Sequence, residues 1–178
     1  TLEQAFLSPR DLIVIDEAHE LEPYVINALR LSLEYSTIPG LINDPVVMRH
    51  VKEPLRGQAV QSNHELFSQL AQLAENAGER RWTMEGELQP AMALMGHVQK
   101  IHTELQRAYP PVKGEEDNEE NARHQATLEW AAQLCGEIGQ LAQAAPEDHV
   151  RYCESWTGDT RPDDLLLQRE PLDIAAFL

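Results

Sequence analysis

The segment DLIVIDEAHELE, residues 11–22, decides what fold the sequence of this 178-residue chain predicts. Four consecutive branched apolar residues, Leu12 to Ile15, predict a strand buried on both faces, as in a parallel sheet covered by helices. Such a strand cannot form alone, so the segment indicates a piece of a larger assembly. Asp16, Glu17 and His19 follow it directly, where open α/β sheets bind their ligands, beyond the carboxyl ends of the strands.

The acidic and histidine residues after this strand suit nucleotide hydrolysis. A carboxylate at the position of Asp16 holds Mg²⁺, usually through water, and Glu17 can accept a proton from the attacking water. His19 can couple changes at that site to a second domain. The D-E-A-H tetrapeptide alone is weak evidence, but the preceding strand is the context that this chemistry requires. The alternative is a solvated strand-to-helix turn whose acids favour a helix N-terminus.

Residues 11–22 closely resemble motif II, the Walker B box, of superfamily 2 helicases. The D-E-A-H motif, followed by a helix and a long helical insertion, resembles the XPD/DinG branch of these helicases. Residues 156–178 are similar to the stretch of DinG-like proteins that rejoins the first motor domain before motif III. The resemblance implies an ATP-dependent DNA helicase that moves 5′ to 3′ on single-stranded DNA with ATP and Mg²⁺ as cofactors. It implies that Asp16 holds magnesium, that Glu17 is the catalytic base, and that His19 couples hydrolysis to DNA movement.

The same resemblance implies a division of the chain into three parts. Residues 1–35 would be the motif II strand and following helix of the first motor domain, 36–147 a helical Arch-like insertion, and 148–178 a hairpin returning to the motor. No G-x-x-x-x-G-K-[ST] phosphate loop occurs in the sequence. We therefore expect a fragment that is inactive alone and works with the remaining helicase domains in cis.

The two cysteines, Cys135 and Cys153, have no C-x-x-C partner, so a zinc site and a disulfide framework are not expected. An iron–sulfur cluster is possible in the parent protein but not in this segment. No apolar run approaches the roughly 20 residues of a membrane span, and no signal peptide is visible. We expect a cytoplasmic protein without membrane contact.

The charge balance argues against a free-standing DNA-binding module. Lys and Arg number 14 against 30 Asp and Glu, a net charge of -16, and the phosphate backbone of DNA repels such a chain. We expect weak or no DNA binding by the chain itself.

One place in the sequence brings a basic pair next to an aromatic residue, and it is the candidate DNA contact: Arg80, Arg81 and Trp82. Trp82, Trp130 and Trp156 could stack bases, but without surrounding basic residues we expect packing anchors.

The overall pattern predicts a mainly α protein (α+β overall), an antiparallel helical bundle with a few short strands from the two ends of the chain. Helical periodicity predicts helices over 60–77, with Gly78 as the stop, 88–108 and 121–145. An acidic loop over 110–120 should separate the last two, and they should pack antiparallel. Alternation near Trp156 and Leu167 predicts a hairpin, and residues 31–35 fit either a helix or a short strand. The predicted apolar stripes are Leu66, Leu70, Leu73 and Ala77; Ala91, Met95, Val98, His102 and Leu105; and Leu128, Ala132, Cys135, Ile138 and Ala142.

A second hypothesis explains the same acidic, helix-forming sequence without an enzymatic activity. The chain would be a non-enzymatic, acidic helical interaction module in which D-E-A-H is incidental. A phosphate loop upstream in the parent protein would favour the helicase.

Overall fold

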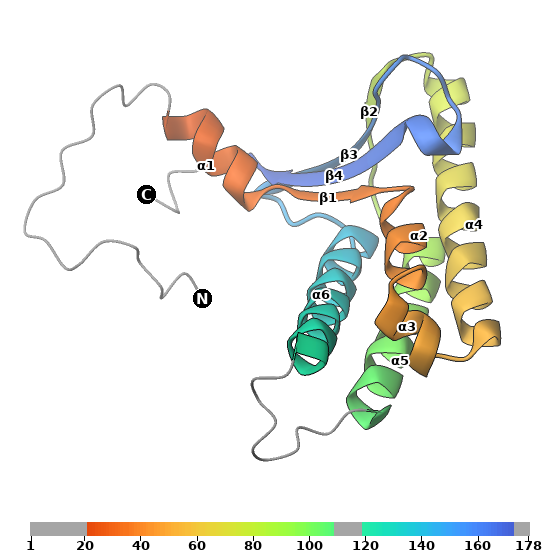
Figure 1. The fold of residues 1–178 in the computed structure, drawn as a ribbon. Coiled ribbons are helices and arrows are strands. Elements are labelled where there is room, and N and C mark those ends of the chain that lie inside the picture. Colours follow the sequence, from red (N-terminus) through yellow and green to blue (C-terminus); the bar gives the residue numbers. More distant parts are fainter. Residues whose placement is uncertain (1–20, 109–118, 173–178) are drawn as a thin grey trace, which may run out of the picture.

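The computed structural model describes residues 21–108 and 119–172, in which helices pack beneath one four-stranded antiparallel sheet (Figure 1). The expected mainly α, α+β class is confirmed. The predicted strand at 12–15, the motif residues Asp16, Glu17 and His19, and most of the acidic loop lie outside the described residues. The elements are α1 (Leu21–Leu29), β1 (Leu31–Glu34), α2 (Thr37–Ile42), α3 (Pro45–His50), α4 (Glu53–Ala77), β2 (Arg81–Thr83), α5 (Gln89–Ala108), α6 (Glu119–Ala142), β3 (His149–Ser155), the 3-10 helix η2 (Pro162–Asp164) and β4 (Leu165–Pro171).

Local signals explain where the long helices begin and end. Gly78 ends α4 as predicted, with a φ of 66° that only glycine adopts readily, and its N–H donates to the Ala74 carbonyl. The helix begins at Glu53, earlier than expected, because Pro54 is compatible with a first turn. Helix α6, predicted over 121–145, also begins early, at Glu119. The last acids of the expected loop, Glu119 and Glu120, therefore form its first turn, where the helix dipole favours them.

The sheet has the order β1-β4-β3-β2, and every neighbouring pair is antiparallel. The predicted hairpin is confirmed as β3 and β4. Residues 31–34 form a strand, which places Leu33 opposite Leu167 at one edge of the sheet. The short strand β2 was not predicted, and it pairs Trp82 with Cys153 at the other edge.

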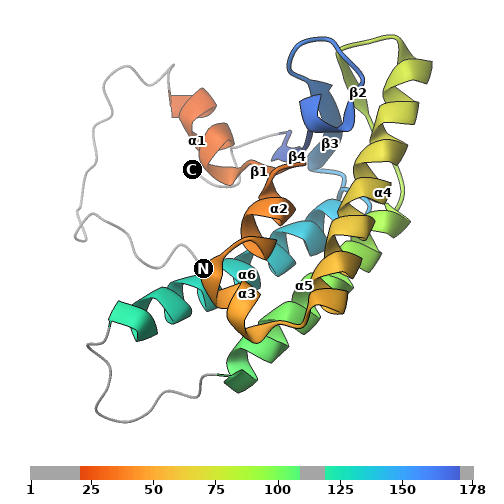
Figure 2. The same cartoon turned by 45° about the vertical axis from the view of Figure 1, so that its right-hand side comes forward.

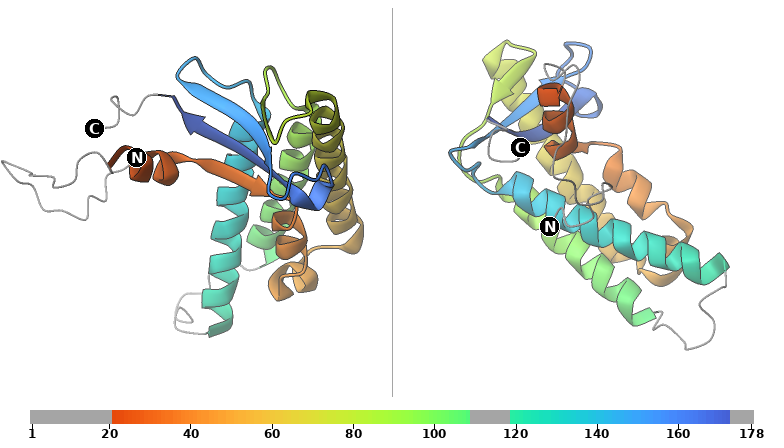
Figure 3. Two further views of the ribbon diagram at one scale, coloured as in Figure 1. Left: turned by 90° about the horizontal axis from the view of Figure 1, so that it is seen from above. Right: turned by 90° about the vertical axis from the view of Figure 1, so that its left-hand side faces the viewer.

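Helices α5 and α6 run antiparallel, as predicted (Figure 2). The Leu88 N–H donates to the Ala142 carbonyl at 2.8 Å near one end of the pair. Near the other end, His124 Nε2 lies 3.0 Å from the Leu105 carbonyl oxygen. Helix α4 packs against α5, and the sheet lies across one end of the three long helices (Figure 3).

The prediction of which helix residues face the core is partly wrong. Leu66, Leu70, Ala91, Val98, Leu105, Ile138 and Ala142 are buried as expected, whereas Leu73, Ala77, Met95, His102, Leu128, Ala132 and Cys135 are half-buried or exposed. Neighbouring positions take their places in the core: Phe67, Ala71, Ala74, Leu94, Ile101, Ala131 and Leu134. These helices carry apolar residues at adjacent positions, so helical period alone allows two overlapping stripes, and the packing partners select between them.

Within 21–108 and 119–172, none of the helices combines the length and the apolar character needed to cross a membrane.

Candidate functional site

The residues predicted to carry hydrolysis, Asp16, Glu17 and His19, lie outside the part of the chain that the structure describes. The predicted DNA contact is described, and it lies where β2, the β3–β4 loop and the end of α4 meet. Helix α4 stops at Gly78, and the chain turns into β2, so Arg80, Arg81 and Trp82 reach the edge of the sheet beside β3.

Trp82 is a packing anchor, as predicted for the tryptophans. Its side chain is 8% exposed and belongs to the hydrophobic core beneath the sheet. A base cannot stack on a ring that is covered in this way, because stacking requires an open aromatic face. Trp82 therefore supports the position of β2 and is not available for stacking in this conformation.

Arg81 binds side chains on the outer face of the sheet, the face turned away from the long helices. Its guanidinium lies 3.5 Å from the ring centroid of Tyr152, and its Nη2 lies 2.8 Å from Glu170 Oε1. Arg30 binds the other oxygen of the same carboxylate at 2.8 Å. The Tyr152 hydroxyl oxygen lies 2.5 Å from Gln168 Oε1 and 3.0 Å from Glu170 Oε2, and these two acceptors share its single proton. This network ties Arg30, between α1 and β1, and Arg81 of β2 to β4.

The network shifts the ionisation of its members. Burial would raise the pKa of Glu170, but hydrogen bonds from Tyr152 and Arg30 and the charge of Arg30 outweigh it and hold that pKa below its ordinary value. Burial, followed by the hydrogen bond to Glu170, raises the pKa of Tyr152 to about 12. Glu170 is therefore a carboxylate and Tyr152 a hydroxyl at neutral pH, which keeps the two arginines paired.

Arg80 holds the loop that follows β3. Its Nη2 donates to the backbone carbonyl of Trp156 at 2.5 Å and lies 3.5 Å from that of Ser155. The Trp156 side chain is 60% exposed, so the prediction that it is a packing anchor is wrong. Its residue follows the last paired residue of β3 and precedes a turn, and the neighbouring strands do not extend over it.

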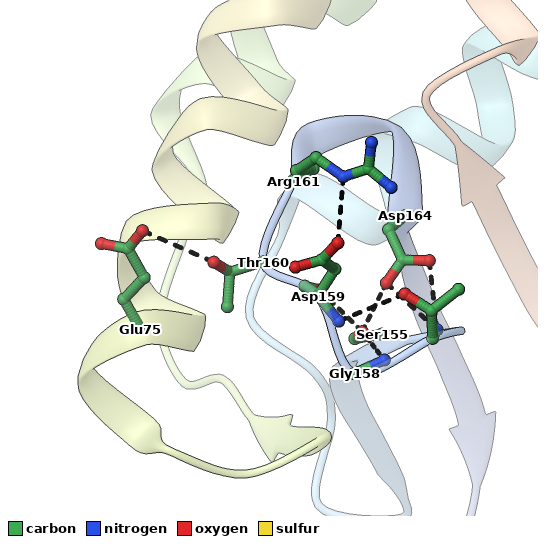
Figure 4. Close-up of polar contacts among 8 residues, drawn as sticks. Glu75, Ser155, Gly158, Asp159, Thr160, Arg161 and Asp164 are labelled. Atoms are coloured by element: carbon green, nitrogen blue, oxygen red, sulfur yellow. Dashed lines mark hydrogen bonds and ion pairs between the residues drawn. The ribbon is translucent and has the colours of Figure 1, made fainter.

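Polar contacts centred on Asp164 fix the loop that carries Trp156 (Figure 4). Asp164 Oδ2 accepts from the Ser155 hydroxyl at 2.5 Å, and both carboxylate oxygens accept from the Thr157 N–H at 3.1 Å. The Gly158 N–H donates to Ser155 Oγ at 2.7 Å, and Gly158 has a φ of 91° that requires glycine. The loop is therefore ordered by internal hydrogen bonds and presents Trp156 from a fixed support.

Acidic side chains outnumber basic ones in this loop, where Asp159, Asp163 and Asp164 accompany Arg161. Arg161 pairs with Asp159 at 3.2 Å, and Thr160 lies 3.4 Å from Glu75 at the end of α4 (Figure 4). Arg80, in contrast to Arg161, has no carboxylate partner among the described residues. It binds backbone carbonyls instead. The surface thus combines one cation with one exposed aromatic ring, which is less positive than a nucleic-acid groove usually is.

No group of three or more His, Cys, Asp or Glu side chains in 21–108 and 119–172 could hold a metal ion. Cys135 is half-buried and Cys153 is buried, and both are free thiols. Burial raises the pKa of the Cys153 thiol to about 12, so it stays protonated at neutral pH. The magnesium ligand expected at Asp16 lies outside the described residues.

Comparisons with protein-family models, with curated proteins and with solved structures found no match to this chain.

Proposed function

We propose that this chain is a segment of an ATP-dependent DNA helicase of the XPD/DinG type, moving 5′ to 3′ on single-stranded DNA in the cytoplasm. The observation that carries the proposal is the D-E-A-H sequence placed directly after the strand-like residues Leu12 to Ile15. In this proposal Asp16 binds Mg²⁺, Glu17 is the catalytic base for ATP hydrolysis, and His19 couples hydrolysis to DNA movement.

The path of the described chain supports an inserted unit. Strand β1 pairs with β4, so Leu31 lies opposite Arg169, and α1 also contacts β4. The chain therefore leaves and returns at neighbouring positions, as an insertion that loops out of a host domain must do. Fold alone does not establish activity, so this is support for the proposal and not its basis.

We propose Arg80 together with Trp156 as the DNA contact, because Arg81 is paired with Glu170 and packed over the Tyr152 ring. Trp82 is covered, whereas Trp156 is open and its backbone binds Arg80. Base stacking on an aromatic ring does not depend on sequence, which suits a motor that moves along DNA. We propose that this contact operates in the intact protein, where the other helicase domains supply the positive groove.

The test replaces Glu17 by Gln in the intact parent protein. ATP hydrolysis should fall by about 10²–10⁴-fold, because the proton acceptor is lost, while nucleotide binding is retained. Glu79→Gln changes an exposed acid at the end of α4 and should leave turnover unchanged. Normal hydrolysis in the Glu17→Gln protein would remove the assigned role. A parent without any ATPase activity would favour the acidic interaction module.

A further inference from the structure

Two buried arginines face each other on the helix-facing side of the sheet. Arg151 of β3 and Arg169 of β4 are directly opposite in the strand register, and they are 1% and 9% exposed. Like charges directly opposite each other destabilise a sheet, and a buried charge is costly unless it is paired. This arrangement requires compensation from its surroundings.

The carboxyl end of α6 and the segment before α5 supply part of that compensation. Arg151 donates to the carbonyls of Leu141 at 3.0 Å and Gln143 at 2.5 Å at the end of α6, and to that of Gly86 at 2.5 Å before α5. Arg169 donates to the Gln140 carbonyl at 2.9 Å. A helix C-terminus carries only about half a negative charge. In the residues that the structure describes, neither guanidinium has a carboxylate at ion-pair distance, and the Nε of each has no hydrogen-bond partner.

A pocket of about 170 Å³ lies beside this excess of positive charge, and Arg169 and His149 line it. The remaining lining comes from Leu29, Leu31 and Gln140, at the junction of α1, β1 and α6. Asp148, the residue before His149, is exposed and bound to His149 at 2.8 Å, and Arg169 contributes to lowering its pKa after the larger effect of the His149 hydrogen bond. Organic ligands usually occupy about 300–1,000 Å³, so the size of this pocket favours a small ligand.

A larger pocket between α3 and α6 does not have this excess of charge. It contains Arg49, Arg123 and His50, but Glu119 and Glu120 line it as well, and Arg49 is paired with Glu120. Its cations are therefore largely neutralised by acids within the same pocket.

We propose that the pocket beside Arg169 binds a small oxyanion of the phosphate class. The guanidinium is a planar donor that matches the oxygens of such an anion, and Leu29 and Leu31 supply apolar lining to the same pocket. The bound anion would neutralise the charge that the end of α6 leaves uncompensated. This inference does not depend on the helicase proposal and stands or falls separately.

The experiment is a titration of the 178-residue chain with inorganic phosphate, followed by amide NMR, against sodium chloride at equal ionic strength. Phosphate should produce saturable shifts at residues 140, 149 and 169, with half-saturation in the millimolar range or below. Arg169→Gln should weaken binding at least tenfold. Arg161→Gln removes an exposed arginine on the distant loop and should leave binding unchanged. Shifts that do not saturate, or equal loss in the Arg161 variant, would overturn the proposal.

A second variant covers the possibility that Arg169→Gln does not fold, since Arg169 also binds α6. His149→Ala leaves the contacts of both arginines with α6 in place and should weaken phosphate binding at least threefold. Unchanged binding in the His149 variant contradicts the site. A single-stranded oligonucleotide at equal phosphate concentration should not reproduce the shifts, because a linked chain does not fit the pocket. If it does reproduce them, the free-anion assignment is wrong.

Discussion

At the scale of single residues, Asp164 shows how one buried carboxylate orders the loop between two strands. It accepts hydrogen bonds from Ser155 and Thr157 and thereby fixes the loop that carries Trp156. Asp164→Asn would replace an acceptor oxygen by an N–H₂ group facing these donors. We expect the free energy of unfolding at pH 7 to fall by about 1–3 kcal/mol, the usual result of an unsatisfied buried polar group. Urea unfolding measures it, with the exposed neighbour Asp163→Asn as the control, expected within about 0.5 kcal/mol of the native protein.

The same residue predicts a pH dependence. Burial would raise the pKa of Asp164, but the hydrogen bonds from Ser155 and Thr157 outweigh it and hold that pKa below its ordinary value. A lowered pKa in the folded state stabilises the protein above the unfolded pKa, and the stabilisation is lost as pH falls through the folded value. The difference between native and Asp164→Asn proteins should therefore shrink as pH falls from about 5 to about 2. A difference that stays constant over this range would show that the charge of Asp164 does not contribute.

Single residues also explain why the site was only partly predictable. Arg80 and Arg81 were identified because a basic pair beside an aromatic residue is visible in the sequence. The exchange of roles between Trp82 and Trp156 was not visible, because it depends on pairing between residues 81–83 and 152–154, far apart in the chain. A strand as short as β2 exists through that pairing and not through its own propensity.

At the scale of elements, the close approach of α5 and α6 depends on the small residue Gly139. A Cβ at Gly139 would lie 3.0 Å from Met95 Sδ, whereas one at Gly136 meets nothing within 4 Å. Gly136→Ala should raise the free energy of unfolding by about 0.5–1 kcal/mol, because alanine favours a helix interior. Gly139→Ala should gain less or lose stability, because Met95 must move. Thermal unfolding of this matched pair measures the difference, and equal stabilisation by both would contradict the proposed close approach at Gly139.

The helices themselves were predictable to within a turn or so at most ends, because period, proline and glycine are local signals. The side that each helix buries was predicted less well. Met95 and Leu94 are both apolar neighbours on α5, and only the position of α4 and α6 decides that Leu94 is buried. The same holds for Cys135 and Leu134 on α6. Local sequence therefore specified the elements, whereas tertiary packing specified their faces.

At the scale of the whole molecule, the charge distribution and the missing phosphate loop predict how the chain behaves in isolation. With Mg²⁺ present, the 178-residue chain should neither hydrolyse ATP nor bind it tightly, because a D-E-A-H sequence supplies metal and water chemistry but no backbone cradle for phosphates. Calorimetry that shows micromolar, magnesium-dependent ATP binding would contradict this.

Single-stranded DNA should also bind the isolated chain weakly, because its net charge of -16 repels phosphates, and in the part of the chain that the structure describes the candidate contact is a single exposed ring, Trp156, beside Arg80. Any binding should weaken further as salt rises, since it depends on few ionic contacts. Fluorescence anisotropy with a labelled oligonucleotide measures it, and Trp156→Ala should remove the residual binding without loss of helix content. In the intact parent, the same substitution should weaken DNA binding by roughly 5–150-fold, the loss of about 1–3 kcal/mol from one stacked base. If Trp156→Ala leaves the parent's DNA affinity unchanged, the exposed ring has another partner, and the helicase assignment then depends on the Glu17 experiment alone.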